Sequence, residues 1–235
     1  VIPCTATFGT EPYSEQPLMP TKKIEGLRSD GTLHMDHKLV IHKPIPKEGK
    51  LHLEKVISAV YDRGEGKGAK INVDIIAKDG AGEPVFTNTM GYLNRWAGGF
   101  GGPKVPHSSV VIPEREADYQ IKDAYPENAP LLYRLTGDTY PLHADPAFAK
   151  KAGFDRPIVH GLCSLGYACR MMIGALFPGE PERMVSIENQ FRAVALPGDH
   201  FTLCVWKTGE NEALFRMVKD SDGKAILDYG RKTWK

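Results

Sequence analysis

Three long segments in the first half of the chain alternate between apolar and polar residues, and short glycine-rich turns separate them. The segments cover residues 51–61, 69–77 and 84–93. A period of two places one face of a strand on a core and the other face toward solvent. Strands joined by such short turns pair with their neighbours in antiparallel order. The first half is therefore predicted to be an antiparallel meander, with a further short strand at residues 38–42.

The second half combines helices with strands. Helices are predicted at residues 128–135, 146–152 and 158–176. In the last of these, apolar residues recur at helical spacing. Strands are predicted at residues 185–194, 200–208, 211–219 and 224–234. A long helix wrapped by a curled antiparallel sheet belongs to the α+β class.

A glycine- and proline-rich stretch at residues 95–107 lies between the two halves, and polar sequence follows it to about residue 124. We divide the chain into an N-terminal half, residues 1–115, and a C-terminal half, residues 116–235. Residues 1–32 are rich in proline, glycine, serine and threonine, and are predicted to be irregular. The sequence thus predicts a central helix in the C-terminal half alone.

Composition excludes several classes of partner. Of the 235 residues, 41% are hydrophobic and 25% are charged, with a formal net charge of +1. No overall field therefore favours nucleic acid or an anionic membrane. No apolar run approaches the roughly 18 residues that a membrane span requires. The sequence shows no signal-peptide pattern and no C-terminal peroxisomal tripeptide. Its start at Val1, not at methionine, leads us to expect an upstream segment that has been removed or left out.

The four cysteines, at positions 4, 163, 169 and 204, show no paired short spacing. Neither a disulfide framework nor a zinc site is predicted. A reducing, intracellular compartment is the default expectation for such a chain.

The segment at residues 135–146, LTGDTYPLHADP, places the acid Asp138 five residues before the base His143. On an unbroken helix the two side chains would lie about 140° apart. Pro141 supplies a bend that brings them together, because it removes a donor and restricts the residue before it. Such a pair can hold one water and move its protons. Asp138 as a simple N-cap for the following turn is the alternative.

Gly161 begins the glycine-containing helix that follows. The first N–H groups of a helix lack intrahelical partners, and the helix dipole favours negative charge there. A carbonyl group docked at Gly161 would be polarised, as in an oxyanion hole. Tight packing of the helix on the sheet is the structural alternative for this glycine.

These residues resemble a known family. The segments YRLTGD at 133–138, PLHADP at 141–146, AGF at 152–154 and PIVHGLC at 157–163 are similar to those of the MaoC-like (R)-specific enoyl-CoA hydratases. Within that family the chain is most similar to the hydratase 2 type, the double hot-dog unit found in peroxisomal multifunctional enzyme type 2. Residues 43–51, 98–102 and 196–199 extend the resemblance over nearly the whole chain.

The resemblance implies a double hot-dog fold with two curled antiparallel sheets. It implies reversible syn hydration of trans-2-enoyl-CoA to (3R)-3-hydroxyacyl-CoA, without a metal or redox cofactor. Asp138 and His143 would activate the water, and the Gly161 N–H would polarise the thioester carbonyl. A first half without a full central helix would leave room for bulky acyl tails.

The resemblance also supplies accessory or substrate-binding positions, which are Tyr140, Asp36, His160, Gly99 and Gly101. Two of them depart from the family pattern. Tyr140 stands where the family has asparagine, so a bulky ring with one hydroxyl replaces an amide with two donors and an acceptor. Asp36 stands where the nearest relatives often have glutamate, which keeps the charge but shortens the reach.

Three other patterns in the sequence do not predict a functional site. His34, Asp36, His37 and His42 lack metal-ligand spacing, because His34 and His37 would point to opposite faces of a strand. The run GGFGG at residues 98–102 has neither a dinucleotide-binding nor a P-loop spacing, so a linker or ligand-lining turn is predicted. Cys163 is interpreted as an inert core residue.

Two further functions compete with the hydratase hypothesis. Tyr140 raises the possibility of an acyl-CoA-binding protein with weakened catalysis, and the same fold would also suit an acyl-CoA thioesterase. The expected partners are an acyl-CoA thioester and, from the family, a second copy in a homodimer; nucleic acid and membrane are not expected. Arg192, Lys207 and Lys104 are candidates for binding the CoA phosphates. The expected compartment is peroxisomal or cytoplasmic.

Overall fold

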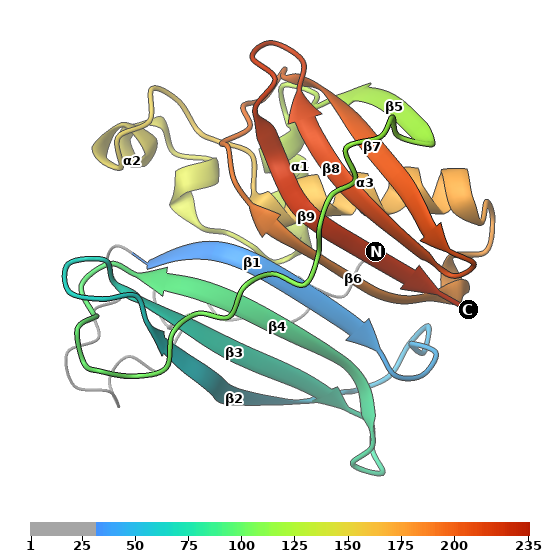
Figure 1. The fold of residues 1–235 in the computed structure, drawn as a ribbon, viewed down its shortest axis with the longest axis horizontal. Coiled ribbons are helices and arrows are strands. Elements are labelled where there is room, and N and C mark those ends of the chain that lie inside the picture. The colour runs from blue at the N-terminus through green and yellow to red at the C-terminus, as the bar shows by residue number, and fades with distance from the viewer. Residues whose placement is uncertain (1–31) are drawn as a thin grey trace. The chain divides into compact units, whose positions relative to one another are not determined.

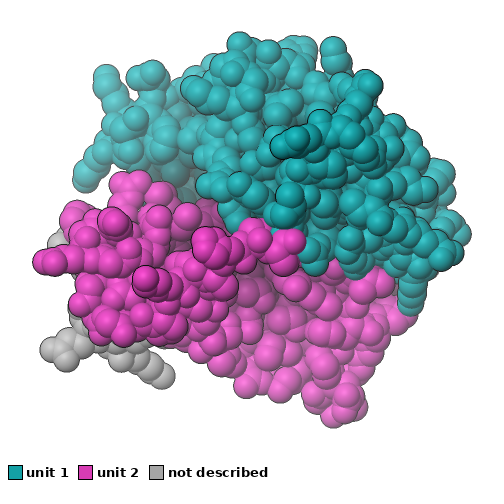
Figure 2. All heavy atoms as spheres, viewed as in Figure 1, with its two compact units in different colours: residues 1–16, 110–184, 189–235 teal, residues 17–109, 185–188 magenta. Residues whose placement is uncertain are grey.

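The computed structural model describes residues 32–235, which form two compact units, shown in two colours in Figure 2. Among the described residues, unit 2 consists of 32–109 and 185–188, and unit 1 consists of 110–184 and 189–235. The predicted boundary between residues 115 and 116 stays a prediction. The predicted irregular segment 1–32 lies outside the described residues, apart from Thr32, which begins a strand.

Unit 2 is a three-stranded antiparallel meander with a fourth strand added at one edge (Figure 1). Its strands are β1 (Thr32–Ile41), β2 (His52–Asp62), β3 (Ala69–Lys78) and β4 (Pro84–Asn94), in the order β2-β3-β4-β1. Buried and half-buried residues alternate along the whole of β3, as the period-two pattern predicts. Within residues 32–109 the structure has no helix, in agreement with the sequence prediction.

β1 is longer than predicted and begins before residue 38. Its register against β4 shifts between His34 and Asp36. A bulge adds one residue to a strand and interrupts the alternation of faces. The first part of β1 therefore does not alternate in the sequence, and the pattern revealed only the second part.

Unit 1 holds the second group of strands and all of the described helices (Figure 1). Its strands are β5 (Tyr119–Ala124), β6 (Met184–Phe191, of which 185–188 are grouped with unit 2), β7 (His200–Gly209), β8 (Glu212–Lys219) and β9 (Ala225–Trp234). The order is β6-β9-β8-β7-β5. β5 was missed, because this short edge strand pairs only with β7 and its polar residues look like a junction. The division of all strands into two sheets stays a prediction.

The three α-helices of unit 1 are α1 (Ala129–Tyr133), α2 (Pro146–Lys151) and α3 (Gly161–Leu176). α3 is the predicted central helix, and it lies across the strands in contact with β7 and β9 (Figure 1). It begins three residues later than predicted, because His160 has extended backbone (φ −61°, ψ 137°) and serves as the N-cap. No helix among residues 32–235 is long and apolar enough to cross a bilayer.

The core of unit 1 forms between α3 and the facing strand residues. Leu165, Ala168 and Met172 are completely buried on the helix. Lys232 on β9 is also completely buried, and its Nζ donates to the Cys169 carbonyl over 3.2 Å. Burial lowers the pKa of this lysine. A cation in this position is stabilised by the helix carbonyl that it contacts, which hydrophobic periodicity does not predict.

Candidate active site

Asp138 and His143 lie in a short connection between α1 and α2. After α1 the chain forms the 3-10 helix η3 (Arg134–Thr136), which ends at Gly137 with a φ of 124°. A second 3-10 helix, η4 (Pro141–His143), follows an extended Tyr140 (φ −57°, ψ 127°). Proline restricts the residue before it to this extended region. The predicted break in the helix at Pro141 is therefore confirmed.

The Asp138 carboxylate is held by main chain within the same turn. Its Oδ1 accepts the N–H of Tyr140 over 3.2 Å. This is a local turn bond of the kind that the capping alternative anticipates. A carboxylate has further acceptor sites, so this bond does not exhaust its capacity. Burial raises the pKa of Asp138, while the nearby His143 works in the opposite direction.

The His143 ring is oriented by a bond to the segment before α3. Its Nδ1 lies 2.9 Å from the Ile158 carbonyl oxygen. A carbonyl only accepts, so Nδ1 carries the hydrogen and, in the neutral ring, Nε2 presents a lone pair. Burial lowers the pKa of His143 below its ordinary 6.5. At neutral pH this imidazole is an uncharged base with a fixed tautomer, as general-base catalysis requires.

His160 lies against both members of the pair. Its ring stacks on the His143 ring with centroids 3.7 Å apart and planes at 25°. Its Nε2 lies 3.3 Å from the Asp138 carbonyl oxygen, so Nε2 is the donor. The structure thus brings together five of the predicted site residues, all in unit 1: Asp138, Tyr140, His143, His160 and Gly161.

Gly161 is the first residue of α3, and the side chain of its N-cap, His160, makes no capping bond. The His160 main chain instead accepts the Ser164 N–H over 3.2 Å. Ser164 Oγ in turn accepts the hydroxyl of the buried Tyr125 over 2.8 Å. These bonds fix the beginning of the helix, where the free N–H groups and the helix dipole suit a polarised carbonyl oxygen.

Gly161 is also closely packed, and this gives a testable prediction. A Cβ at this position would meet the Phe191 ring at 2.9 Å. We expect Gly161→Ala to displace the start of α3 or the Phe191 ring. The rate of enoyl-CoA hydration, the reaction that the resemblance implies, should then fall about 10-fold, because small misplacements are costly in catalysis. Steady-state kinetics measure the effect.

The matched control is Gly166→Ala on the same helix, where a Cβ meets nothing within 4 Å. This change should leave activity intact and raise the free energy of unfolding by about 0.5–1 kcal/mol, because alanine is the better helix former. Equal activities of the two variants would show that close packing at Gly161 does not matter for the site.

Tyr140 contributes differently through its main chain and its side chain. Its N–H binds Asp138, a bond that any residue except proline can make. Its ring makes edge contacts with the rings of His143 and Phe148, at centroid distances of 6.1 and 5.4 Å. The turn therefore depends only on the main chain of Tyr140, while its side chain places an aromatic ring beside His143.

The remaining predicted positions, Asp36, Gly99 and Gly101, belong to unit 2. Asp36 lies at the β1 bulge and forms an ion pair with Lys70 on β3 over 2.8 Å. It faces Gly91, where a Cβ would come within 2.1 Å of its carboxylate. These contacts give Asp36 a structural role in its sheet, and its part in a substrate site stays a prediction.

The N–H groups of Gly99 and Gly101 bind the carboxylate of Asp62, which the sequence analysis did not single out. The two bonds measure 2.8 and 2.7 Å, and a third comes from the Gly64 N–H at 2.8 Å. These bonds hold the pKa of Asp62 below its ordinary range. The GGFGG run is therefore a loop wrapped around a carboxylate at the end of β2.

We expect Asp62→Asn to lower the melting temperature at neutral pH, because an amide cannot accept three N–H groups as a carboxylate does. A depressed carboxyl pKa contributes stability above the unfolded-state pKa of about 4 and loses it as the pH falls. The difference from the wild type should therefore shrink in acid. Scanning calorimetry between neutral and acid pH measures it, with the exposed Glu65→Gln in the neighbouring turn as the control. A difference that is constant with pH would contradict the assignment.

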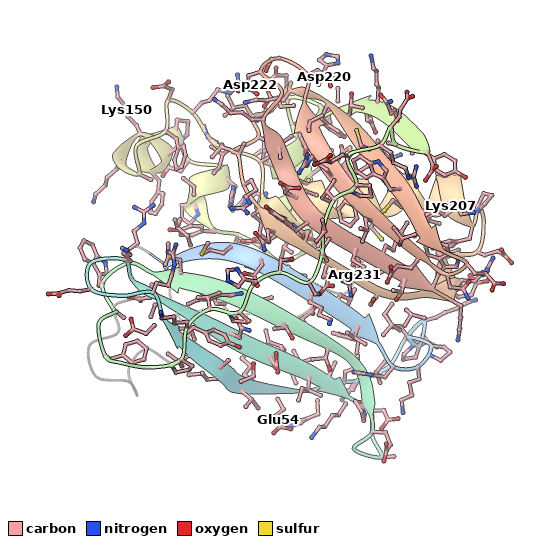
Figure 3. All side chains as sticks on the ribbon, viewed as in Figure 1. Glu54, Lys150, Lys207, Asp220, Asp222 and Arg231 are labelled. Atoms are coloured by element: carbon pink, nitrogen blue, oxygen red, sulfur yellow. The ribbon has the colours of Figure 1, made fainter. Side chains whose placement is uncertain are left out.

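The prediction that His34 and His37 point to opposite faces of a strand is wrong, because the bulge in β1 interrupts the alternation and their rings lie in edge contact, with centroids 5.5 Å apart. Among residues 32–235 no group of three or more potential ligands is arranged to hold a metal. Cys163 is buried, and burial raises the pKa of its thiol to about 12, so it remains protonated. Arg192 lies over the Tyr229 ring at 5.1 Å. Lys207 lies near the end of β7, away from Asp220 and Asp222 near the β8–β9 turn (Figure 3).

Sequence profiles of two families match the chain. The MaoC like domain matches residues 108–227, and the MFE-2 hydratase 2 N-terminal domain matches residues 2–95. Enoyl-CoA hydratase ChsH3 of Mycobacterium tuberculosis is 33% identical over 88% of this chain and 73% of its own length. Probable enoyl-CoA hydratase 2 of Dictyostelium discoideum is 35% identical over 88% of this chain and 72% of its own length.

Solved structures show the same fold. The MaoC-like dehydratase of Phytophthora capsici has a TM-score of 0.80 at 32% identity, covering 87% of this chain and 72% of its own. A Mycobacterium tuberculosis protein described as having a double hotdog fold has a TM-score of 0.53 at 15% identity, covering 86% of this chain and 74% of its own. The fold is the α+β double hot-dog, with its central helix in the C-terminal half. From the MaoC like match over 108–227 and the hydratase 2 match over 2–95, this chain belongs to the MaoC-like dehydratase family, and within it to the hydratase 2 type.

Proposed function

We propose that this chain catalyses the reversible hydration of trans-2-enoyl-CoA thioesters to (3R)-3-hydroxyacyl-CoA. The observation that carries the proposal is the neutral His143, with Nδ1 bound to Ile158 and Nε2 available, beside the buried Asp138 and the start of α3. Relatives named as enoyl-CoA hydratases support the substrate class. We infer the (3R) configuration of the product from the chain's membership of the hydratase 2 type.

The proposed chemistry requires one proton to leave a water and another to reach carbon. Asp138 and His143 hold the water, and one of them takes its proton as the oxygen forms a bond to C3. The electron pair of the double bond moves toward the thioester oxygen, where the Gly161 N–H stabilises the developing charge. The acid formed in the first step, or its partner, then returns a proton to C2. The addition is redox-neutral, so the scheme uses these groups alone.

Crotonyl-CoA and its longer homologues test the proposal directly. Purified protein should remove the absorbance of the conjugated enoyl thioester, and chiral analysis of the product should give the 3R alcohol. Absence of hydration with short, medium and long acyl chains would overturn the proposal. Formation of the 3S alcohol would contradict the stereochemical part.

An acyl-CoA-binding protein with weakened catalysis is the second candidate, and the Tyr140 ring beside His143 is the observation that favours it. Tight binding of CoA esters without turnover, followed by rescue of hydration in Tyr140→Asn, would support this candidate. Under the hydratase proposal, Tyr140→Asn changes the rate by less than about 10-fold, because the main-chain bond to Asp138 is kept. A thioesterase would instead release free CoA, which a thiol reagent detects.

We also propose that the chain forms a homodimer and acts in peroxisomes or the cytoplasm. The family resemblance supports the dimer, and relatives from mouse and Arabidopsis thaliana are named as peroxisomal. Light scattering on the purified protein should give twice the chain mass of 26.0 kDa. A monomer over the concentration range of the activity assay would contradict the dimer.

A further inference from the structure

We infer that His160 is a positioning residue for the hydration, which holds the main chain of Asp138 and flanks the ring of His143, so that a single side chain sets the relative placement of the acid and the base. The inference rests on the proposed function. It arises from the unusual position of this ring, which is 1% exposed and contacts both members of the pair without capping its own helix.

The first contact steadies the loop that carries Asp138. Asp138 follows Gly137, whose positive φ marks the end of η3 and is a conformation that glycine adopts without steric cost. The bond from His160 Nε2 to the Asp138 carbonyl ties this loop to the residue just before α3. The Asp138 carboxylate is then oriented by the Tyr140 N–H two residues further along the chain. Together the two bonds fix both the backbone and the side chain of the acid.

The second contact restrains the base. The bond from Nδ1 to Ile158 holds one edge of the His143 ring, and a single hydrogen bond does not fix the rotation of the ring about it. The His160 ring, stacked on it with centroids 3.7 Å apart, opposes such rotation and covers one face of the His143 ring. The Tyr133 ring, 4.7 Å from His160, supports the stack. His160 therefore contributes to the burial that keeps His143 uncharged.

The groups around His160 explain why it positions but does not itself transfer protons. Those facing it are His143, the Asp138 carbonyl, the Arg134 guanidinium and the Tyr133 ring. Burial, and after it the neighbouring His143 and Arg134, lower the pKa of His160 to about 2. An uncharged His160 places no like charge against His143 when that ring accepts a proton.

Two substitutions separate the two contacts. His160→Gln keeps a donor, because its amide nitrogen stands the same number of bonds from Cβ as Nε2, but it removes the flat ring. His160→Phe keeps the ring and removes the donor. Each variant is assayed for kcat and KM against pH with crotonyl-CoA, its melting temperature is measured, and the His143 imidazole is titrated by NMR without substrate.

We expect His160→Phe to lower kcat about 10- to 100-fold with little change in KM, while the acid limb of the pH profile stays in place. We expect His160→Gln to lose less at its optimum, but to move the acid limb and the His143 titration to higher pH, because water reaches the ring. Wild-type kcat and wild-type His143 titration in both variants would overturn the inference. So would equal losses of kcat in both variants with an unmoved His143 titration, since this is the signature of a merely structural side chain.

The NMR titration keeps the two proposals distinguishable. If the wild-type protein shows no hydration, the proposed function fails, while the titration of His143 in the variants still decides whether His160 controls that ring. If His160→Phe does not fold, the acid limb and the titration of His160→Gln give the decision.

Discussion

Asp138→Asn is expected to reduce kcat for enoyl-CoA hydration by about 10²- to 10⁴-fold, the range for losing a general acid or base. Asparagine has nearly the same shape and can still accept the Tyr140 N–H, so the turn survives. It cannot exchange a proton with water or with C2. We therefore expect an unchanged melting temperature and a KM close to that of the wild type. Single-turnover and steady-state rates with crotonyl-CoA measure the loss.

Asp145→Asn is the matched control for this change. Asp145 lies in the same motif, but it is the N-cap of α2, where it accepts the Ala147 N–H over 2.8 Å. Asparagine caps helices as well as aspartate does, so activity should stay within a factor of about two. A loss below 10-fold in Asp138→Asn would show that Asp138 is structural, as the capping alternative holds.

His143→Gln is expected to cause a loss of similar size and to change the pH profile. In the proposed mechanism the neutral ring is the active form, and burial lowers the pKa of His143 below 6.5. Activity should therefore persist below pH 6.5 and fall as the pH drops through the lowered pKa. Without the imidazole this acid limb should disappear. Rates between acid and neutral pH, with the exposed His200→Gln as the control, provide the measurement.

The double variant gives a further check on the pair. Residues that act as a unit show effects that are far from additive. If Asp138 and His143 share one water, Asp138→Asn combined with His143→Gln should be little slower than the slower single variant. Losses that multiply would mean that the two residues act independently, and the shared-water scheme would then be wrong.

The sequence predicted those parts of the structure that depend on local pattern. Period-two alternation located β2, β3 and β4 within a residue or two, and helical spacing located α3. Local pattern failed where a register shift or a partner decides the outcome. The bulge at His34 and Asp36 concealed the first half of β1, and β5 is a strand because β7 supplies its hydrogen bonds.

The candidate site likewise contains residues that the sequence could identify and contacts that it could not. Asp138, His143 and Gly161 could be named because their residue types, the proline between the first two and the glycine at a helix start each carry a chemical meaning. The Ile158 carbonyl that selects the His143 tautomer is main chain, and no side-chain signal identifies it. Asp62 lies far in sequence from Gly99 and Gly101, whose N–H groups bind it, so neither segment reveals the loop by itself.

The sequence by itself determined the meander and the central helix, and it suggested the proposed acid–base pair, because backbone periodicity, the restriction imposed by Pro141 and the chemistry of side chains are local properties. Only the tertiary structure decided which tautomer His143 has, why it is uncharged, that His160 lies against it and that Lys232 is buried beneath α3. These features depend on contacts between segments distant in sequence and on the loss of water around them. Burial and long-range contact exist only once the chain has folded.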